Sequence, residues 1–222
     1  MAVSRRDMRS NPCFEVRKFK GEARRKRYLL PDEETRLMQA LVGRRAYLRL
    51  IVVIALQTGM RRGEILRLRK QDIDFYRGEI HVTKTKTDND REVPMTPTLE
   101  RELKRHCETL GSDFLFANQK TRMPITEFKH GFDSACEQAG IRDFWFHDIR
   151  HTAATRMAES GVDPFTIAAI MGHTDIKMTA SYTHATTSAR RAAVAALEQA
   201  SFGSGPQMAH KTDQRPLLTA AG

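Results

Sequence analysis

A long apolar stretch at residues 47–57, YLRLIVVIALQ, limits what this chain can fold into more than any other feature. If these residues form a helix, nearly every face of it is apolar, and such a helix must be covered by other elements on all sides. The stretch is also far shorter than the roughly 20 residues that cross a bilayer. We therefore expect a helix buried at the centre of one compact domain, and 222 residues are enough to build such a domain.

Apolar residues recur at helical spacing on both sides of this stretch, and short β-prone segments interrupt them. The first expected helix begins at Pro31. Further helices are expected at residues 47–57, 64–68, 98–109, 125–139, 147–160, 164–171, 177–183 and 188–200, and Gly161 and Gly172 end two of them. The expected strands are 72–75, 79–83 and 91–95, with 114–116 as a further short strand. The pattern predicts a mainly α fold with a small antiparallel β-sheet, in the α+β class.

Positive charge is concentrated at the start of the chain. Residues 1–28 hold ten basic and three acidic residues, a net of +7 out of +10 for the whole sequence. Residues 203–222 are rich in Gly, Ser, Pro and Gln and show no periodicity, which predicts a disordered tail. We expect a basic arm at 1–28, a folded domain at 29–202 and a tail at 203–222. A basic arm suits a polyanion such as nucleic acid, although a solvated linker would have the same composition.

The cysteines give no sign of a secreted protein. Cys13, Cys107 and Cys136 are far apart and form no CxxC pair, so neither a disulfide framework nor a cysteine metal site is predicted. No apolar run predicts a membrane span or a signal peptide. A cytoplasmic protein fits this pattern best.

The motif TGMRRGE at residues 58–64 holds arginines at the entrance to a short helix. A guanidinium fixed there can bind a phosphate through two parallel hydrogen bonds, and Glu64 can orient Arg61 for this purpose. The alternative interpretation is a surface arginine with a carboxylate that complements the helix dipole.

The motif HDIRH at residues 147–151 places His147, Arg150 and His151 on one face of a helix. Two histidines four residues apart also suit zinc, with Asp148 at the position of a general base. A fixed cation at Arg150 opposes a divalent metal, whereas a histidine beside an arginine suits proton transfer at an anionic phosphate. We interpret His151 as a packed, hydrogen-bonded core histidine.

Two further motifs follow, MGHT at residues 171–174 and ASYTH at residues 180–184. Tyr182 stands among small and polar residues and has little apolar company in the sequence. Taken alone, it is best interpreted as a half-buried tyrosine whose hydroxyl finds a hydrogen-bond partner.

Together and in this order, the motifs TGMRRGE, HDIRH and MGHT followed by a tyrosine resemble the catalytic domain of tyrosine recombinases of the phage integrase family. The resemblance covers about residues 28–195. In TKTKTDNDREVPM at residues 83–95, the family's spacing to the Val-Pro pair selects Lys86 as the catalytic lysine, with Lys84 as the competing choice. The resemblance implies the catalytic-domain fold of that family and a catalytic set of Arg61, Lys86, His147, Arg150, His173 and Tyr182.

The resemblance also implies a mechanism and partners. Tyr182 would attack DNA to form a 3′-phosphotyrosyl intermediate, Arg61 and Arg150 would hold the phosphate, and Lys86 would protonate the leaving group. His147 would act as general acid and base, and His173 would donate a hydrogen bond to the phosphate. The expected partners are double-stranded DNA and further copies of the chain, as a tetrameric synapse, with neither cofactor nor metal.

Three alternatives stay open at this point. A type IB topoisomerase would use the same covalent chemistry but rejoin the strand that it cut. A zinc hydrolase would use His147 and His151 with His173 or His184. A catalytically inactive DNA-binding protein would retain the fold alone. The resemblance also implies a separate helical DNA-clamping domain before the catalytic domain. We expect residues 1–28 to be the linker that follows such a domain, with the chain either an excised catalytic domain or a naturally shortened protein.

Overall fold

The computed structural model describes residues 27–83, 90–118, 120–180, 182, 191, 194, 195 and 197. The chain divides into a unit at residues 1–183 and a second unit at residues 184–222. The described residues beyond position 183 are helical, and most of the helix expected at 188–200 lies outside the described residues, as do the arm at 1–26 and the tail at 203–222. The fold described below is that of the first unit.

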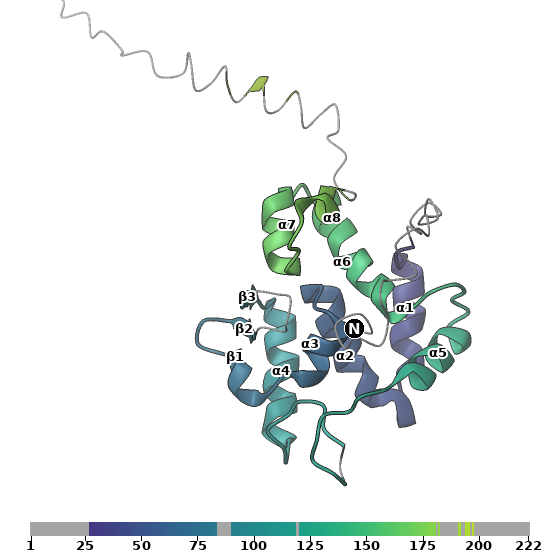
Figure 1. The fold of residues 1–222 in the computed structure, drawn as a ribbon. Coiled ribbons are helices and arrows are strands. Elements are labelled where there is room, and N and C mark those ends of the chain that lie inside the picture. The colour runs from purple at the N-terminus through teal and green to yellow at the C-terminus, as the bar shows by residue number, and fades with distance from the viewer. Residues whose placement is uncertain are drawn as a thin grey trace, which may run out of the picture. The chain divides into compact units, whose positions relative to one another are not determined.

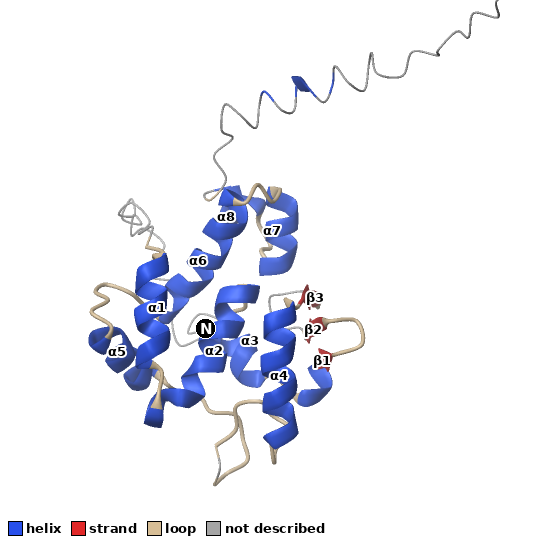
Figure 2. Ribbon diagram, turned by 180° about the vertical axis from the view of Figure 1, so that it is seen from behind, coloured by secondary structure: helices blue, strands red, loops and turns tan. Residues whose placement is uncertain are grey.

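Helices dominate this unit, and the strands lie at one edge of it (Figure 2). The α-helices are α1 Pro31–Ala40, α2 Ala46–Thr58, α3 Arg62–Arg67, α4 Pro97–Thr109, α5 Lys129–Gln138, α6 Phe146–Glu159, α7 Pro164–Met171 and α8 Ile176–Ala180. The 3-10 helices η1 and η2 are Gly43–Arg45 and Lys70–Asp72. The strands are β1 Ile73–Asp74, β2 Glu79–Val82 and β3 Arg91–Pro94. The predicted class, mainly α with a small antiparallel sheet, is confirmed.

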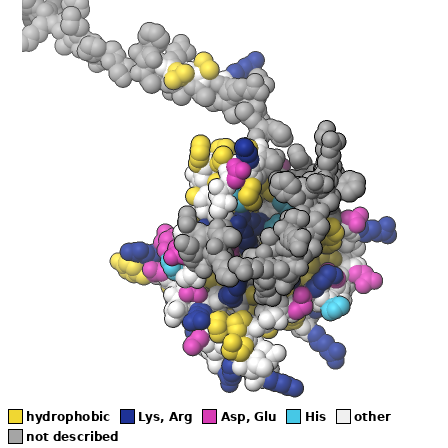
Figure 3. Space-filling view, in the orientation of Figure 1, with side chains coloured by type: hydrophobic (Ala, Val, Ile, Leu, Met, Phe, Trp, Pro, Cys, Tyr) yellow, Lys and Arg dark blue, Asp and Glu magenta, His cyan; other side chains and the backbone are white. Residues whose placement is uncertain are grey.

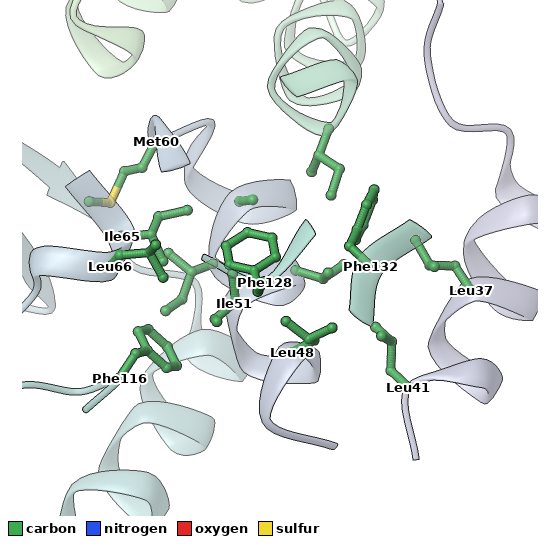
Figure 4. Close-up of a cluster of buried hydrophobic side chains, with 14 of the residues drawn as sticks. Leu37, Leu41, Leu48, Ile51, Met60, Ile65, Leu66, Phe116, Phe128 and Phe132 are labelled. Carbon is green, nitrogen blue, oxygen red and sulfur yellow. The ribbon is translucent and has the colours of Figure 1, made fainter. Parts of the chain in front are cut away.

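Helix α2 is the central element, as its apolar sequence predicts. It packs against α3, α4 and α6, and six of its residues are buried (Leu48, Ile51, Val52, Ile54, Ala55 and Thr58). Figure 4 shows Leu48 and Ile51 beside the rings of Phe128 and Phe132, which come from the segment around α5. No helix in the described part of the chain is both long and apolar enough to cross a membrane.

The sheet has the order β1-β2-β3 with antiparallel pairing throughout. Ile80 on β2 pairs with Val93 on β3, and both are buried against the core. At the other end of the same ladder Val82 pairs with Arg91. Strand β3, which begins at Arg91, also contacts α7. Helices α7 and α8 lie together at one end of α6 (Figure 1).

Two helices that lead to the candidate site end in a left-handed glycine. Helix α2 ends at Gly59, with φ +65°, and α7 ends at Gly172, with φ +67°. A glycine there lets the chain reverse direction without steric strain, because side chains rarely tolerate positive φ. The two glycines turn the backbone so that the carbonyls around them become available to side chains from other elements.

The segment before α5 differs from its prediction. The helix expected at 125–139 begins only at Lys129, because Ile125 donates its N–H to the Phe116 carbonyl at 2.9 Å in extended pairing. The Glu127 carboxylate then accepts hydrogen bonds from the N–H groups of Phe128 and Lys129, at 2.8 and 2.7 Å, and so caps the helix start. The strand expected at 114–116 is a single isolated bridge between Arg69 and Phe114.

The left-handed glycine at position 59 also lies in a packed environment, and this can be tested. A Cβ at Gly59 would lie 2.3 Å from Sδ of the buried Met171, whereas a Cβ at Gly78, with φ +70°, would meet nothing within 4 Å. We expect Gly78→Ala to lower the free energy of unfolding by about 1–2 kcal/mol through backbone strain alone. Gly59→Ala should cost about 1–3 kcal/mol more, because it also overpacks the core. Urea denaturation measures both values, and equal losses would refute the packing claim.

Candidate active site

The site begins at the N-terminus of α3, where Arg61 is held by the carboxylate of Glu64. The backbone N–H of Arg61 donates to Glu64 Oε2 at 2.8 Å, and Nη1 of Arg61 donates to Glu64 Oε1 at 3.0 Å. Glu64 is buried, while the Arg61 side chain is about one-third exposed. One carboxylate thus caps the helix and fixes the direction of the guanidinium.

A second arginine, Arg91 from β3, binds the same carboxylate. Its Nη1 and Nη2 donate to the two oxygens of Glu64 at 3.1 and 2.7 Å, and its Nε donates to the Ile170 carbonyl at 3.0 Å. Burial opposes ionisation of Glu64, but the hydrogen bonds from Arg91 and Arg61 outweigh it and lower the pKa of that carboxyl below its usual value. Arg91 is not among the site residues that the sequence motifs selected, so its role in the site was missed.

Arg150 is the most deeply buried arginine of the set. It projects from α6 and donates to the carbonyls of Gly59 and Met171, both at 2.6 Å. Arg61 makes the matching contact across the site, from Nη2 to the Gly172 carbonyl at 2.9 Å. Burial, followed by repulsion from Arg61, lowers the pKa of Arg150 to about 10, so it stays charged at neutral pH.

Charge in this cluster is unbalanced. Arg61, Arg91 and Arg150 carry three positive charges, and Glu64 is the carboxylate that hydrogen-bonds two of them. Backbone carbonyls position Arg150 without neutralising it. Counted over these four described side chains the charge is positive, and such a group of guanidiniums suits an anion.

His173, directly after the C-terminus of α7, lies beside this cluster. Its Nδ1 is hydrogen-bonded to Oγ1 of the buried Thr179 at 2.8 Å. Burial and the charges of Arg150 and Arg61 lower the pKa of His173 to about 4. The imidazole is therefore neutral at pH 7, and if the Thr179 hydroxyl donates to Nδ1, Nε2 carries the proton and can donate to an anion.

His147 and His151 lie one turn apart on α6, with their rings edge to face and 5.0 Å between centroids. His147 is exposed, yet the protein atoms around it and the charge of Arg150 lower its pKa. His151 is half-buried, and its Nδ1 is hydrogen-bonded to the hydroxyl of Tyr182. His151 is packed and hydrogen-bonded, as interpreted from the sequence, but it is half-buried rather than part of the core, and its ring faces the candidate nucleophile.

Tyr182 follows α8, and its backbone N–H donates to the Thr179 carbonyl at 2.9 Å. Its ring packs against a small apolar cluster of Ala154, Ile167 and Met171, from α6 and α7. The interpretation of Tyr182 as a half-buried tyrosine whose hydroxyl finds a hydrogen-bond partner is confirmed, and its apolar neighbours come from other helices. The packing leaves the hydroxyl directed at His151, 5.7 Å between ring centroids.

Five of the six residues predicted for the site lie in the described structure, and mutual charge effects connect them. Arg61 and Arg150 both affect the pKa values of His147 and His173, and Tyr182 affects that of Arg150. Figure 3 shows basic and histidine side chains in the middle of one face of the molecule. The sixth residue, Lys86, lies outside the described residues, as does its competitor Lys84.

The zinc alternative requires three ligands to meet. Within the residues that the structure describes, no group of three His, Cys, Asp or Glu side chains is arranged to hold a metal ion. His173 and His151 are instead hydrogen-bonded to the hydroxyls of Thr179 and Tyr182.

Comparison with known proteins shows which family this chain is similar to. The profile of the family described as "Phage integrase family" matches residues 27–189. The shufflon-specific DNA recombinase of Escherichia coli is 36% identical over 178 residues, which are 79% of this chain and 44% of that protein. A tyrosine recombinase of Pseudothermotoga lettingae is 30% identical over 181 residues, 78% of this chain and 62% of that one. The chain thus spans about half of the length of these relatives.

Solved structures show the same fold. The Tn1549 transposon integrase, in complex with circular intermediate DNA, has a TM-score of 0.69 and 26% sequence identity over 81% of this chain and 69% of its own. The XerA recombinase has a TM-score of 0.63 and 29% identity over 77% of this chain and 65% of its own. The fold described above is therefore that of tyrosine recombinase catalytic domains.

The buried carboxylate of Glu64 gives a prediction for stability. Glu64→Gln leaves Arg91 without its buried counter-ion and should lower the free energy of unfolding by about 3 kcal/mol at pH 7. The matched control is Glu92→Gln, one residue from Arg91 on β3, where an exposed carboxylate pairs with His81. That change should cost less than about 1 kcal/mol. Similar losses in both variants, measured by urea denaturation, would contradict the role given to Glu64.

The stability difference between the wild type and Glu64→Gln should also depend on pH. Because the pKa of Glu64 is lowered by folding, its contribution is complete above the pKa of the unfolded glutamate, about 4.3, and declines as the pH falls through the lower folded value. The difference in stability between the wild type and Glu64→Gln should therefore be constant at neutral pH and shrink below about pH 4.

Proposed function

The chain belongs to the phage integrase family, and from this we propose that it is a site-specific DNA recombinase that cleaves and rejoins DNA through a 3′-phosphotyrosyl link to Tyr182. One observation carries the proposal. The Tyr182 hydroxyl is hydrogen-bonded to a histidine on the helix that also holds His147 and the buried Arg150. A nucleophile, a proton acceptor and an anion-binding group thus meet in one place.

Arg61 and Arg150 are proposed to bind the two non-bridging oxygens of the scissile phosphate. Charge builds up on these oxygens when the phosphorus is attacked, and fixed donors stabilise it best because they need not reorganise. The carbonyls of Gly59 and Met171 take two of the five N–H donors of Arg150. They hold the guanidinium at one orientation while the rest of its donors serve the phosphate.

His173 is proposed to donate a third hydrogen bond to the phosphate, as a neutral imidazole oriented by Thr179. His147, which is exposed and also of lowered pKa, is proposed to exchange protons with the DNA as a general acid and base. Because the phosphotyrosine keeps the energy of the broken bond, rejoining needs no nucleotide, and the cations of the protein replace a metal ion.

Lys86 is proposed as the acid that protonates the departing 5′ oxygen. Its support comes from the described ends of the segment that contains it. Val82 and Arg91 are paired across β2 and β3, and Arg91 contacts Glu64 in the site. The described residues on either side of this segment, Val82 and Arg91, therefore lie beside the arginine cluster.

The proposed partners are double-stranded DNA and other copies of the chain. The Tn1549 integrase was solved in complex with DNA, and the net charge of +7 in residues 1–28 suits a phosphate backbone. Exchange between two duplexes breaks four strands, and each copy carries one Tyr182, which favours a tetramer. We further propose that residues 1–28 act as a basic arm, 29–202 as the catalytic domain and 203–222 as a tail. The names of the relatives support a recombinase rather than a type IB topoisomerase.

The first functional prediction concerns the nucleophile. Tyr182→Phe should abolish the covalent protein–DNA adduct while leaving the protein folded and its DNA affinity nearly unchanged, since it removes one oxygen from a ring packed on apolar side chains. A pool of nicked duplexes of randomised sequence serves as the substrate, and a denaturing gel measures the adduct. Adducts that persist in this variant would show that another residue attacks.

The second concerns Lys86 and its competitor Lys84. A 5′-bridging phosphorothiolate has a sulfur leaving group that departs without protonation. If Lys86 is the acid, Lys86→Ala should cleave ordinary DNA slowly and the phosphorothiolate at a nearly normal rate. Lys84→Ala, the matched control, should show a smaller defect of equal size on both substrates. Rescue of Lys84→Ala instead would move the acid to position 84.

A further inference from the structure

Tyr182 and His151 form the most direct contact between a reacting atom and a titratable side chain in the described structure. Nδ1 of His151 is hydrogen-bonded to the phenol oxygen, and the two rings are tilted by 39°. Both partners are fixed by their surroundings, His151 in the middle of α6 and Tyr182 by its packing on Ile167 and Met171. The protein's own packing therefore holds the two side chains in contact.

We propose that His151 is the catalytic base that removes the phenol proton of Tyr182 in the cleavage step. The inference rests on the proposed function and deepens it, because it assigns nucleophile activation to a residue outside the set that the sequence motifs selected. Nucleophilic oxygens are commonly activated by a base within hydrogen-bond reach, and Nδ1 of His151 meets this condition.

Cleavage moves one proton from Tyr182 to His151 and another from Lys86 to the DNA. The phenol proton moves to Nδ1 of a neutral His151 whose other nitrogen, Nε2, carries a hydrogen. The phenol oxygen forms a bond to phosphorus, the bond from phosphorus to the 5′ oxygen breaks, and that oxygen takes a proton from Lys86. In rejoining, the 5′ hydroxyl attacks phosphorus and returns its proton to Lys86, while the Tyr182 oxygen departs and recovers its proton from His151.

Division of labour between the two α6 histidines follows from their positions. His151 is half-buried against Tyr182, whereas His147 is exposed and touches His151 through the ring edge-to-face contact of 5.0 Å. His151 is thus placed to serve the nucleophile and His147 to serve the DNA. Both rings stand on the helix that carries Arg150, so the phosphate and the phenol oxygen meet the same rigid element.

The charges around His151 favour this transfer. His147 and Arg150 face it from α6, His173 from the end of α7 and Tyr182 from beyond α8. Helix α2 also packs on α6, but its one charged side chain, Arg49, contacts the Met38 carbonyl. Arg150 and Tyr182 attract each other when the phenol is ionised, so the fixed guanidinium stabilises the developing phenolate. His173, kept neutral, does not repel a protonated His151.

The test uses His151→Asn in the full chain. The asparagine Oδ1 can occupy the place of Nδ1 and accept the phenol hydrogen bond, but it cannot hold the proton. His130→Asn, an exposed histidine on α5, is the matched control. The rate of adduct formation is measured on a duplex selected from the nicked pool, with an ordinary and with a 5′-phosphorothiolate linkage.

His151→Asn should form the adduct about 100-fold or more slowly than the wild type, the usual size of general-base catalysis, with unchanged DNA affinity. The phosphorothiolate should not rescue it, because the nucleophile rather than the leaving group is impaired. His130→Asn should match the wild type throughout.

A rate for His151→Asn within about twofold of the wild type, or rescue by the phosphorothiolate, would overturn the proposal. If the asparagine variant does not fold, His151→Ala with added imidazole replaces it, and cleavage that does not rise with imidazole concentration would likewise overturn it. Failure of the proposed function looks different, because the wild type would then form no adduct or Tyr182→Phe would still form one.

Discussion

The rest of the site depends on the ion pairs that the buried carboxylate of Glu64 makes with Arg61 and Arg91. This carboxylate caps α3, fixes Arg61 and binds both terminal nitrogens of Arg91. Through Arg91 it also connects β3 to the backbone of α7 at Ile170. Repulsion among guanidinium groups would otherwise oppose the assembly of these elements, and a single buried anion removes part of it while leaving the net positive charge that a phosphate requires.

Left-handed glycines make the second half of this arrangement possible. The turns at Gly59 and Gly172 bring backbone carbonyls to Arg150 and Arg61, each arginine being held by a segment distant from its own. Carbonyl oxygens orient a guanidinium without cancelling its charge. The site is thus an electrostatic environment prepared before DNA arrives, and such preorganisation is a principal source of catalytic power.

How far the sequence predicts this molecule depends on how local each signal is. The apolar run of α2 predicted the central helix, and the periodicity and the motifs predicted the fold class. The catalytic set implied by the motifs stays a prediction. The start of α5 was misplaced because Ile125 is held in extended pairing by the Phe116 carbonyl, a contact that the helical spacing of the sequence does not show. The contacts of His151 and Arg91 were missed because their partners, Tyr182 and Glu64, lie 31 and 27 residues away, and only the folded chain brings them together.

The most direct test of this account is to identify the residue that carries DNA. After reaction with the nicked pool, nuclease and trypsin digestion followed by tandem mass spectrometry should find a nucleotide attached through its 3′ phosphate to the peptide of residues 178–190, whose one tyrosine is Tyr182. Fragment ions should place the nucleotide on that tyrosine. A nucleotide on any other residue, or cleaved DNA without attached protein, would contradict the mechanism.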